Sequence, residues 1–152
     1  MGNMRELYGD CWDLWRTAPS VTGLCITSNG TVKRDGSCVM GRGIALQVKQ
    51  RVPGFDSTLG ERILLNGNHV HLFKYTTTKF FSFPVKHNWY EVADIELIKR
   101  SCKELMAILE PSDLVLLPRP GCGNGKLKWS DVRPAIAPLL DDRVAVVTWS
   151  PQ

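Results

Sequence analysis

The distribution of apolar and polar residues predicts strands and helices that alternate along the chain. Runs rich in apolar, β-branched or aromatic residues, as expected for strands, occupy positions 21–27, 69–74, 79–85, 114–117 and 144–149. A helix is predicted over 44–51, ahead of Pro53, and another from a cap at Ser130 to Leu140, where Pro138 predicts an irregular end. This alternation indicates a central sheet with helices packed on its faces.

The most regular amphipathic pattern predicts a helix over residues 95–109. Its apolar residues recur at spacings of three and four and therefore share one face: Ile95, Ile98, Cys102, Leu105, Met106 and Leu109. Asp94 is a suitable N-cap, and Pro111 prevents the helix from continuing. In a sheet between helix layers, ligands bind beyond the carboxyl ends of the strands, so a site is expected in the segments that follow them.

Length and composition are those of one ordinary domain, which we expect to span residues 1–152. Hydrophobic residues make up 43% of the chain and charged residues 22%, which excludes a disordered polar protein. No apolar run approaches the roughly 20 residues of a membrane span. The polar segment 1–10 lacks the apolar core of a signal peptide. We therefore expect a cytoplasmic protein without membrane partners and assume a monomer.

The cysteines do not have the spacing of a metal site or a disulfide framework. Their number is odd and no two form a close pair: Cys11, Cys25, Cys38, Cys102 and Cys122. We expect reduced thiols, at least two of them in the core, and neither a metal nor another cofactor.

The net charge of +4 suits an anionic ligand, although an ordinary basic surface has the same charge. Lysine and arginine are scattered without a run of five, which argues against a nucleic-acid-binding tail. Charge alone therefore identifies no ligand.

Two glycine-rich loops stand where a strand is predicted to pass into a helix. One precedes Ile44 and the other follows the strand at 114–117: Val39-Met40-Gly41-Arg42-Gly43 and Pro120-Gly121-Cys122-Gly123-Asn124-Gly125. Amides at a helix start or in such a nest bind anions, and glycine lets the backbone approach them. Neither loop is a P-loop or a Gly-x-Gly-x-x-Gly motif. Each alone is typical of a turn, whereas the pair favours a diphosphate.

Several short motifs follow one another in a fixed order. They are Gly9-Asp10, Asn29, Met40-Gly41-Arg42-Gly43-Ile44-Ala45, Phe83-Pro84-Val85-Lys86-His87-Asn88-Trp89, Gly121-Cys122-Gly123-Asn124-Gly125 and Trp129. In this order the chain resembles macrodomains, which bind ADP-ribose, over nearly its whole length. It is most similar to the branch with the antitoxin that removes ADP-ribose from DNA and the terminal ADP-ribose protein glycohydrolase. The resemblance implies a three-layer α/β/α fold with a mixed central sheet.

The resemblance also implies a role for each end of the ligand. Asp10 would accept a hydrogen bond from the adenine amino group, the glycine loops would wrap the diphosphate, and Asn29 would contact the distal ribose. From the residues alone, Asp10 is equally an N-cap for a helix over 11–16, and Asn29 a turn residue beside Gly30. The expected ligand-binding residues are Asp10, Cys11, Asn29, Met40, Gly41, Arg42, Gly43, Ile44, Pro120, Gly121, Cys122, Gly123, Asn124, Gly125 and Trp149.

Lys86 matches the lysine to which the resemblance assigns catalysis. At the end of an apolar strand it is expected to be partly desolvated, which lowers its pKa and favours a nucleophilic neutral amine. The alternative is a surface lysine paired with phosphate or an acid. The sequence departs at Gly125 from the glycohydrolase pattern of the human-type branch, which has an aspartate there. The antitoxin branch also lacks this acid, which places the chain nearer to the antitoxin. His87 and Asp35 are the candidates for a replacement acid or base.

Other features border this expected site. The loop from Gly30 to Cys38 is longer than in the antitoxin pattern and is expected to shape the distal end. Trp149 either stacks on adenine or packs in the core. The other tryptophans expected at the rim are Trp12, Trp15 and Trp89. The nest around Cys122 is expected to lower its thiol pKa, but the resemblance gives this residue only a backbone role.

The leading hypothesis is a hydrolase that uses Lys86 to remove ADP-ribose from a modified acceptor. A nucleobase in single-stranded DNA is the favoured acceptor. One alternative is a non-catalytic reader or sponge of ADP-ribose or a nucleotide derived from it. Another is a hydrolase of ADP-ribose 1″-phosphate or O-acetyl-ADP-ribose. A purely structural or nucleic-acid-binding module would not explain the paired glycine loops.

Overall fold

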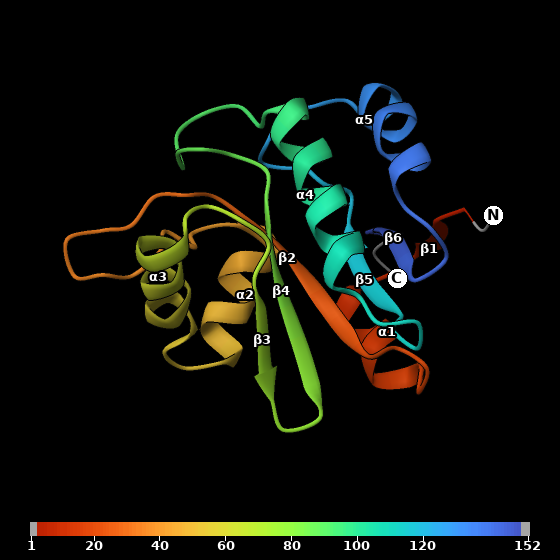
Figure 1. Ribbon diagram of the computed structural model, residues 1–152, viewed down its shortest axis with the longest axis horizontal. Coiled ribbons are helices and arrows are strands. Elements are labelled where there is room, and N and C mark those ends of the chain that lie inside the picture. The colour runs from red at the N-terminus through yellow and green to blue at the C-terminus, as the bar shows by residue number, and fades with distance from the viewer. Residues whose placement is uncertain (1–2, 150–152) are drawn as a thin grey trace.

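Strands and helices alternate along the chain, as the apolar pattern predicts. The computed structural model describes residues 3–149. In order, the elements of this part are β1 (Arg5–Tyr8), α1 (Cys11–Thr17), β2 (Gly23–Ser28), α2 (Gly43–Arg51), α3 (Phe55–Asn66), β3 (Leu72–Tyr75), β4 (Thr78–Pro84), α4 (Ile95–Ile108), β5 (Val115–Pro118), α5 (Trp129–Ile136), the 3₁₀ helix η1 (Ala137–Leu139) and β6 (Val144–Thr148) (Figure 1).

The strands form one mixed sheet in the order β1-β6-β5-β2-β4-β3. Every neighbouring pair is parallel except β3 and β4, which a short turn joins into an antiparallel hairpin. Parallel neighbours need long crossover connections, and the helices provide them. The carboxyl ends of the parallel strands therefore point to the same edge of the sheet.

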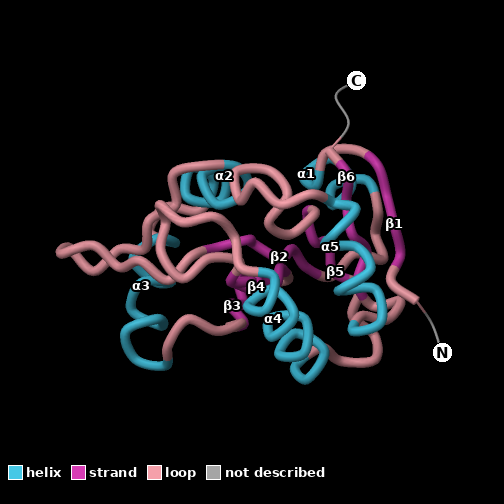
Figure 2. The backbone as a smooth tube through the Cα atoms, turned by 90° about the horizontal axis from the view of Figure 1, so that it is seen from above, coloured by secondary structure: helices cyan, strands magenta, loops and turns pink. Residues whose placement is uncertain are grey.

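Helices cover both faces of the sheet, as seen from above in Figure 2. Alternate residues of β5 enter different cores: Leu116 packs with residues of α1, α2 and α3, whereas Val115 and Leu117 pack with residues of α4 and α5. Side chains that alternate between two apolar layers belong to a strand buried on both faces. The predicted three-layer α/β/α arrangement with a mixed sheet is therefore confirmed.

The core also holds most of the thiols. Cys11, Cys25, Cys38 and Cys102 are buried, and all five cysteines are free. The expectation that at least two cysteines lie in the core is confirmed.

Helix boundaries agree with the predicted caps in one case and differ in another. Asp94 is the N-cap of α4, and its carboxylate accepts a hydrogen bond from the amide of Glu96. The prediction that Ser130 caps the last helix is wrong, because α5 begins at Trp129 and Lys128 is its N-cap. The glycine loop closes immediately before this point through a bond from the amide of Leu127 to the carbonyl of Gly121. The irregular end predicted from Pro138 is present as η1.

Two elements did not stand out in the apolar pattern. Strand β1 is short and largely exposed at an edge of the sheet, so its side chains carry little periodic signal. Helix α3 has Gly60 in its interior, where a Cβ atom would overlap the carbonyl of Gly36. The absence of a side chain at Gly60 lets the loop from Gly30 to Cys38 pack closely against α3. The amide of Cys38 also donates to the carbonyl of Asp56 at 2.9 Å.

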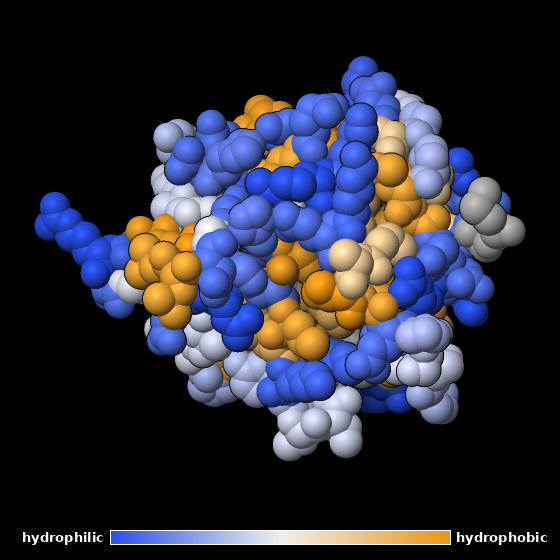
Figure 3. Space-filling view, viewed as in Figure 1, coloured by the Kyte–Doolittle hydropathy of each residue, from blue (hydrophilic) through white to orange (hydrophobic). Residues whose placement is uncertain are grey.

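The outer surface is mainly polar on the face drawn in Figure 3, with several smaller apolar areas among the polar residues. No helix within residues 3–149 is long and apolar enough to cross a membrane.

Candidate functional site

A cleft of about 1280 Å³ opens beyond the carboxyl ends of the parallel strands. The residues that directly follow β2, β4, β5 and β6 all line it: Asn29, Val85, Arg119 and Trp149. Figure 1 shows the loops after β2, β4 and β5 leaving the same end of the sheet. This is the position where ligands bind to sheets of this kind.

Most of the expected site residues meet in this cleft, although they come from distant parts of the chain. Lys86 and thirteen of the expected ligand-binding residues line it: Asp10, Cys11, Asn29, Gly41, Arg42, Gly43, Ile44, Gly121, Cys122, Gly123, Asn124, Gly125 and Trp149. Met40 and Pro120 do not. Met40 is buried in the core on the side of α2, and Pro120 is buried beneath its loop.

Four further candidates lie away from the cleft. Trp12 and Trp15 stack on each other at a ring distance of 5.9 Å and line a separate groove, so they are not at the rim. The carboxylate of Asp35 accepts hydrogen bonds from the amide and the hydroxyl of Ser37, so it is engaged within its own loop. His87 pairs with Asp94 at 2.9 Å. Neither Asp35 nor His87 lines the cleft, so neither is placed to replace the missing acid.

The first glycine loop presents the start of α2 to the cleft. Gly43 has a φ of 56°, a backbone conformation that favours glycine, and α2 has no side-chain cap. The amide of Leu46 donates to the carbonyl of Arg42, as in the first turn of a helix. The amides that precede Leu46 lack acceptors within the helix, and they lie at the N-terminal end of α2, where a helix favours negative charge. This geometry suits a phosphate.

The second glycine loop is tightly packed at two positions and open at a third. A Cβ atom at Gly121, whose φ is 75°, would lie 2.8 Å from Cδ1 of Ile98. At Gly125, a Cβ atom would lie 2.5 Å from the carbonyl oxygen of Gly121. At Gly123, by contrast, no heavy atom of residues 3–149 other than its chain neighbours lies within 4 Å of the Cβ position. The loop therefore turns its closely packed side to α4 and its open side to the cleft.

Asp10 is the N-cap of α1 and also lines the cleft. Its Oδ1 atom accepts hydrogen bonds from the amides of Trp12 at 2.9 Å and Asp13 at 3.2 Å. No residue from 3 to 149 donates a hydrogen bond to its other oxygen, Oδ2. The structural role foreseen for this carboxylate is thus present, and one acceptor atom remains for a ligand. Trp149 is 69% exposed, which excludes core packing for its side chain.

Asn29 ties together the two ends of the loop from Gly30 to Cys38. Its Nδ2 atom donates to the carbonyl of Val39 at 2.9 Å, and its Oδ1 atom accepts from the amide of Thr31 at 3.0 Å. The side-chain amide of Asn29 therefore stabilises the turn. Its second hydrogen and second lone pair leave it able to contact a ligand as well.

Lys86 is buried at the end of β4, with only 7% of its surface exposed. Its Nζ atom donates to the carbonyl of Trp89 at 3.3 Å, and it forms no salt bridge within the described chain. Burial, and then the positive charges of Lys126 and Arg42, lower its pKa. The side chain is thus neither a solvated surface lysine nor the partner of an acid.

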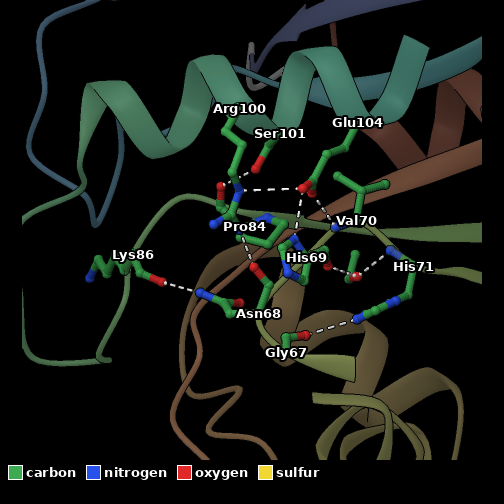
Figure 4. A network of polar contacts seen from close by, with 11 residues as sticks. Gly67, Asn68, His69, Val70, His71, Pro84, Lys86, Arg100, Ser101 and Glu104 are labelled. Atoms are coloured by element: carbon green, nitrogen blue, oxygen red, sulfur yellow. Dashed lines mark hydrogen bonds and ion pairs between the residues drawn. The ribbon is translucent and has the colours of Figure 1, made fainter. Parts of the chain in front are cut away.

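A network behind Lys86 fixes its backbone (Figure 4). The carbonyl of Lys86 accepts a hydrogen bond from Nδ2 of Asn68 at 3.1 Å, and Arg100 on α4 donates to the carbonyl of Asn68. Ser101, also on α4, donates to the carbonyl of Pro84 at 2.7 Å. Helix α4 therefore holds the end of β4 from one side, while the amine of Lys86 extends away from the network.

The electrostatics of the cleft are predominantly positive. Its charged lining comprises Lys33, Arg42, Lys86, Arg119 and Lys126 against Asp10 and Glu91. Lys126 has a φ of 67°, and the guanidinium of Arg119 stacks over Trp129 at 4.6 Å. No local motif marked Lys33, Arg119 or Lys126, because only the fold brings them to one cavity.

The thiol of Cys122, in the second glycine loop, is not activated by its surroundings. Burial raises the pKa of Cys122, with a smaller opposing effect from Arg119, so the expectation of a lowered thiol pKa is wrong. Among residues 3–149, no group of three or more His, Cys, Asp or Glu side chains is placed to hold a metal ion.

The chain is similar to known proteins in both sequence and structure. No protein-family model matches the chain. The DNA ADP-ribosyl glycohydrolase of Thermus aquaticus is 27% identical over 120 residues, which make up 73% of this chain and 33% of that protein. The chain thus spans about a third of the length of the curated relatives that it matches.

Solved structures match almost the whole chain. The macrodomain of Thermus aquaticus DarG has a TM-score of 0.74 and 25% identity, covering 97% of this chain and 98% of that one. Thermosipho africanus DarTG in complex with ADP-ribose has a TM-score of 0.74 and 21% identity, covering 97% of this chain and 43% of that one. Together with the mixed sheet, these similarities show that the chain has the macrodomain fold and is similar in sequence and structure to the macrodomains of DarG proteins.

Proposed function

We propose that the cleft binds ADP-ribose and that the chain hydrolyses the bond between ADP-ribose and a nucleobase of single-stranded DNA. The observation that carries this proposal is Lys86, a buried amine that has no acidic partner among residues 3–149 and lies in the cleft lined by both glycine loops. The name of the Thermus aquaticus relative, DNA ADP-ribosyl glycohydrolase, supports the activity. The ADP-ribose bound to Thermosipho africanus DarTG supports the ligand.

In this proposal the ligand runs along the cleft from Asp10 to Lys86. Oδ2 of Asp10 accepts a hydrogen bond from the adenine amino group, beside Cys11 and Trp149. The amides of the two glycine loops surround the diphosphate, with Gly123 at the open side. Asn29 contacts the distal ribose, whose anomeric carbon then lies near the amine of Lys86.

The proposed reaction uses the lowered pKa of Lys86. The neutral amine attacks the anomeric carbon, and the bond from that carbon to the base breaks, with its electron pair passing to the base nitrogen. The ammonium formed at Nζ returns a proton to the departing base. Water then hydrolyses the sugar–lysine adduct, which releases ADP-ribose and restores the amine. Because the lysine itself supplies the proton, the scheme needs no acid at Gly125.

The charge of the cleft supports a nucleic-acid acceptor. A diphosphate carries about two negative charges, whereas the cleft has four cationic side chains besides Lys86, against two carboxylates. The surplus suits the phosphates of a strand attached to the distal ribose, since phosphate contacts supply much of the affinity for nucleic acids.

A second candidate is a non-catalytic reader of ADP-ribose. The specific observation in its favour is the packing at Gly125, which leaves no space for the aspartate of the glycohydrolase pattern. A reader would bind the same ligand in the same cleft but would release nothing.

The test is incubation of the protein with ADP-ribosylated single-stranded DNA, with release of ADP-ribose as the readout. Wild type is expected to release it, whereas Lys86→Ala is expected to lose at least about a hundredfold in rate. The affinity of Lys86→Ala for free ADP-ribose, measured by calorimetry, should remain close to that of wild type. Lys103→Ala, an exposed lysine on α4, is the matched control.

Equal rates for wild type and Lys86→Ala would overturn the catalytic assignment. Binding of ADP-ribose without any release by the wild type would favour the reader.

A further inference from the structure

The turn that follows Lys86 displays two aromatic side chains at the rim of the cleft. Trp89 is 54% exposed and Tyr90 is 67% exposed, and both line the cleft. Their rings lie edge to face, with centroids 5.9 Å apart and planes at 85°. Large aromatic surfaces left open beside a cavity favour the docking of another flat group.

The backbone of this turn is held firmly although the rings are exposed. The amide of Asn88 donates to Oε1 of Glu91 at 2.7 Å, and the amide of Glu91 donates to the carbonyl of Asn88 at 3.1 Å. The amide of Trp89 donates to Oγ1 of Thr31 at 3.0 Å. A preformed surface loses little conformational entropy when a ligand stacks on it.

The aromatic turn is joined both to the reactive amine and to a positive side chain. Nζ of Lys86 donates to the carbonyl of Trp89, so the turn adjoins the proposed point of bond cleavage. Thr31 lies in the loop from Gly30 to Cys38, which also brings Lys33 to the cleft. This loop forms its own hairpin, with Val32 paired to Cys38. Aromatic faces beside cationic groups are the combination that binds single-stranded nucleic acids.

We propose that Trp89 and Tyr90 form a stacking platform for an unmodified base next to the ADP-ribosylated nucleotide, with Lys33 contacting the phosphate between them. This inference rests on the proposed function and adds to it that a strand, rather than a single modified nucleoside, is recognised. The adenine of ADP-ribose is not the occupant, because its proposed position is beside Asp10, whereas the platform adjoins Lys86.

The test compares two ADP-ribosylated substrates, a single-stranded oligonucleotide and the corresponding nucleoside. Wild type is expected to have the higher kcat/KM for the oligonucleotide. Trp89→Ala and Tyr90→Ala should each reduce this preference about tenfold, the effect of losing one base–aromatic stack. Trp89→Phe should keep most of it. Tyr8→Ala is the matched control, since Tyr8 is 70% exposed but lies outside the cleft.

Binding provides a second readout that does not require turnover. In the Lys86→Ala background, anisotropy should show tighter binding of the ADP-ribosylated oligonucleotide than of the nucleoside, and the same substitutions should remove the difference. An absence of hydrolysis together with this binding difference would reject the proposed function but keep the platform. An unchanged preference in both aromatic variants would overturn the platform. Two further outcomes would also overturn the platform. One is an equal loss of affinity for free ADP-ribose, which would place the rings against that ligand. The other is an equal effect of the substitutions on an ADP-ribosylated peptide.

Discussion

The Cβ position of Gly125 lies 2.5 Å from the carbonyl oxygen of Gly121, so the second glycine loop has no room for a side chain there. The same position is 2.8 Å from Cβ of Ala93, whose amide donates to the carbonyl of Gly125 at 3.0 Å. An acid is therefore excluded by the packing of the loop against the segment that leads into α4. Any reaction in the cleft therefore has to proceed without a carboxylate at this point.

Gly125→Asp is expected to damage the protein rather than add an acid. Steric overlap with Gly121 should reduce the free energy of unfolding by about 1–3 kcal/mol. The displaced loop should also bind ADP-ribose more weakly. Thermal unfolding and calorimetry measure the two effects, with Gly123→Ala as the control for stability. A variant that keeps the wild-type Tm and hydrolyses faster would contradict this explanation.

Gly123→Val should affect the ligand without affecting the fold. Apart from its chain neighbours, the Cβ position of Gly123 meets no heavy atom of the described residues within 4 Å, so a larger side chain is accommodated in the free protein. The branched side chain would occupy the space where the proposed diphosphate approaches the loop amides. We expect an unchanged Tm and a loss of at least about tenfold in ADP-ribose affinity by calorimetry. Wild-type affinity would remove this loop from the binding site.

The rate should increase with pH and level off below the ordinary lysine pKa of about 10.5. Burial and two neighbouring cations lower the pKa of Lys86, and only the neutral amine is nucleophilic. Lys126→Gln removes one of these cations, so the pKa of Lys86 should increase and the profile should move to higher pH. At neutral pH this variant is expected to be slower. Lys128→Gln, outside the cleft, should leave the midpoint unchanged, and a shift to lower pH for Lys126→Gln would contradict the assignment.

Asn68→Ala should weaken catalysis through the position of Lys86. The variant loses the hydrogen bond to the carbonyl of Lys86, whereas the bond from Arg100 to the backbone carbonyl of residue 68 remains. Small displacements of a reacting group cost one to two orders of magnitude in rate, so a kcat about tenfold lower is expected. KM and the affinity for free ADP-ribose should change little. Asn66→Ala, at the exposed end of α3, is the control, and equal rates for the two variants would reject the positioning role.

Substitutions of Asp10 should separate its two functions. Asparagine is also a good N-cap, so Asp10→Asn is expected to keep the Tm while losing affinity for ADP-ribose, because an amide nitrogen replaces one acceptor oxygen. Asp10→Ala should lose affinity and, in addition, about 1 kcal/mol of stability. The measurements are thermal unfolding and calorimetry. An undiminished affinity in Asp10→Asn would contradict the adenine contact.

The sequence alone determined the features that depend on neighbouring residues. The spacing of apolar residues identified α4, Asp94 was recognisable as its cap, and the position of the glycine loops after strands indicated where the cleft lies. Such features are readable because a helix period, a cap or a tight turn involves residues only a few positions apart.

Only the tertiary structure decided which of these residues meet and what surrounds them. In the structure, Met40 is buried in the core, Trp12 and Trp15 line a groove apart from the cleft, and the contacts at Gly125 leave no space for a side chain. It also placed Asn68 behind Lys86, although the two residues are 18 positions apart. The physical reason is that burial, steric space and local potential arise from side chains on several elements, whose approach no local pattern of residues encodes.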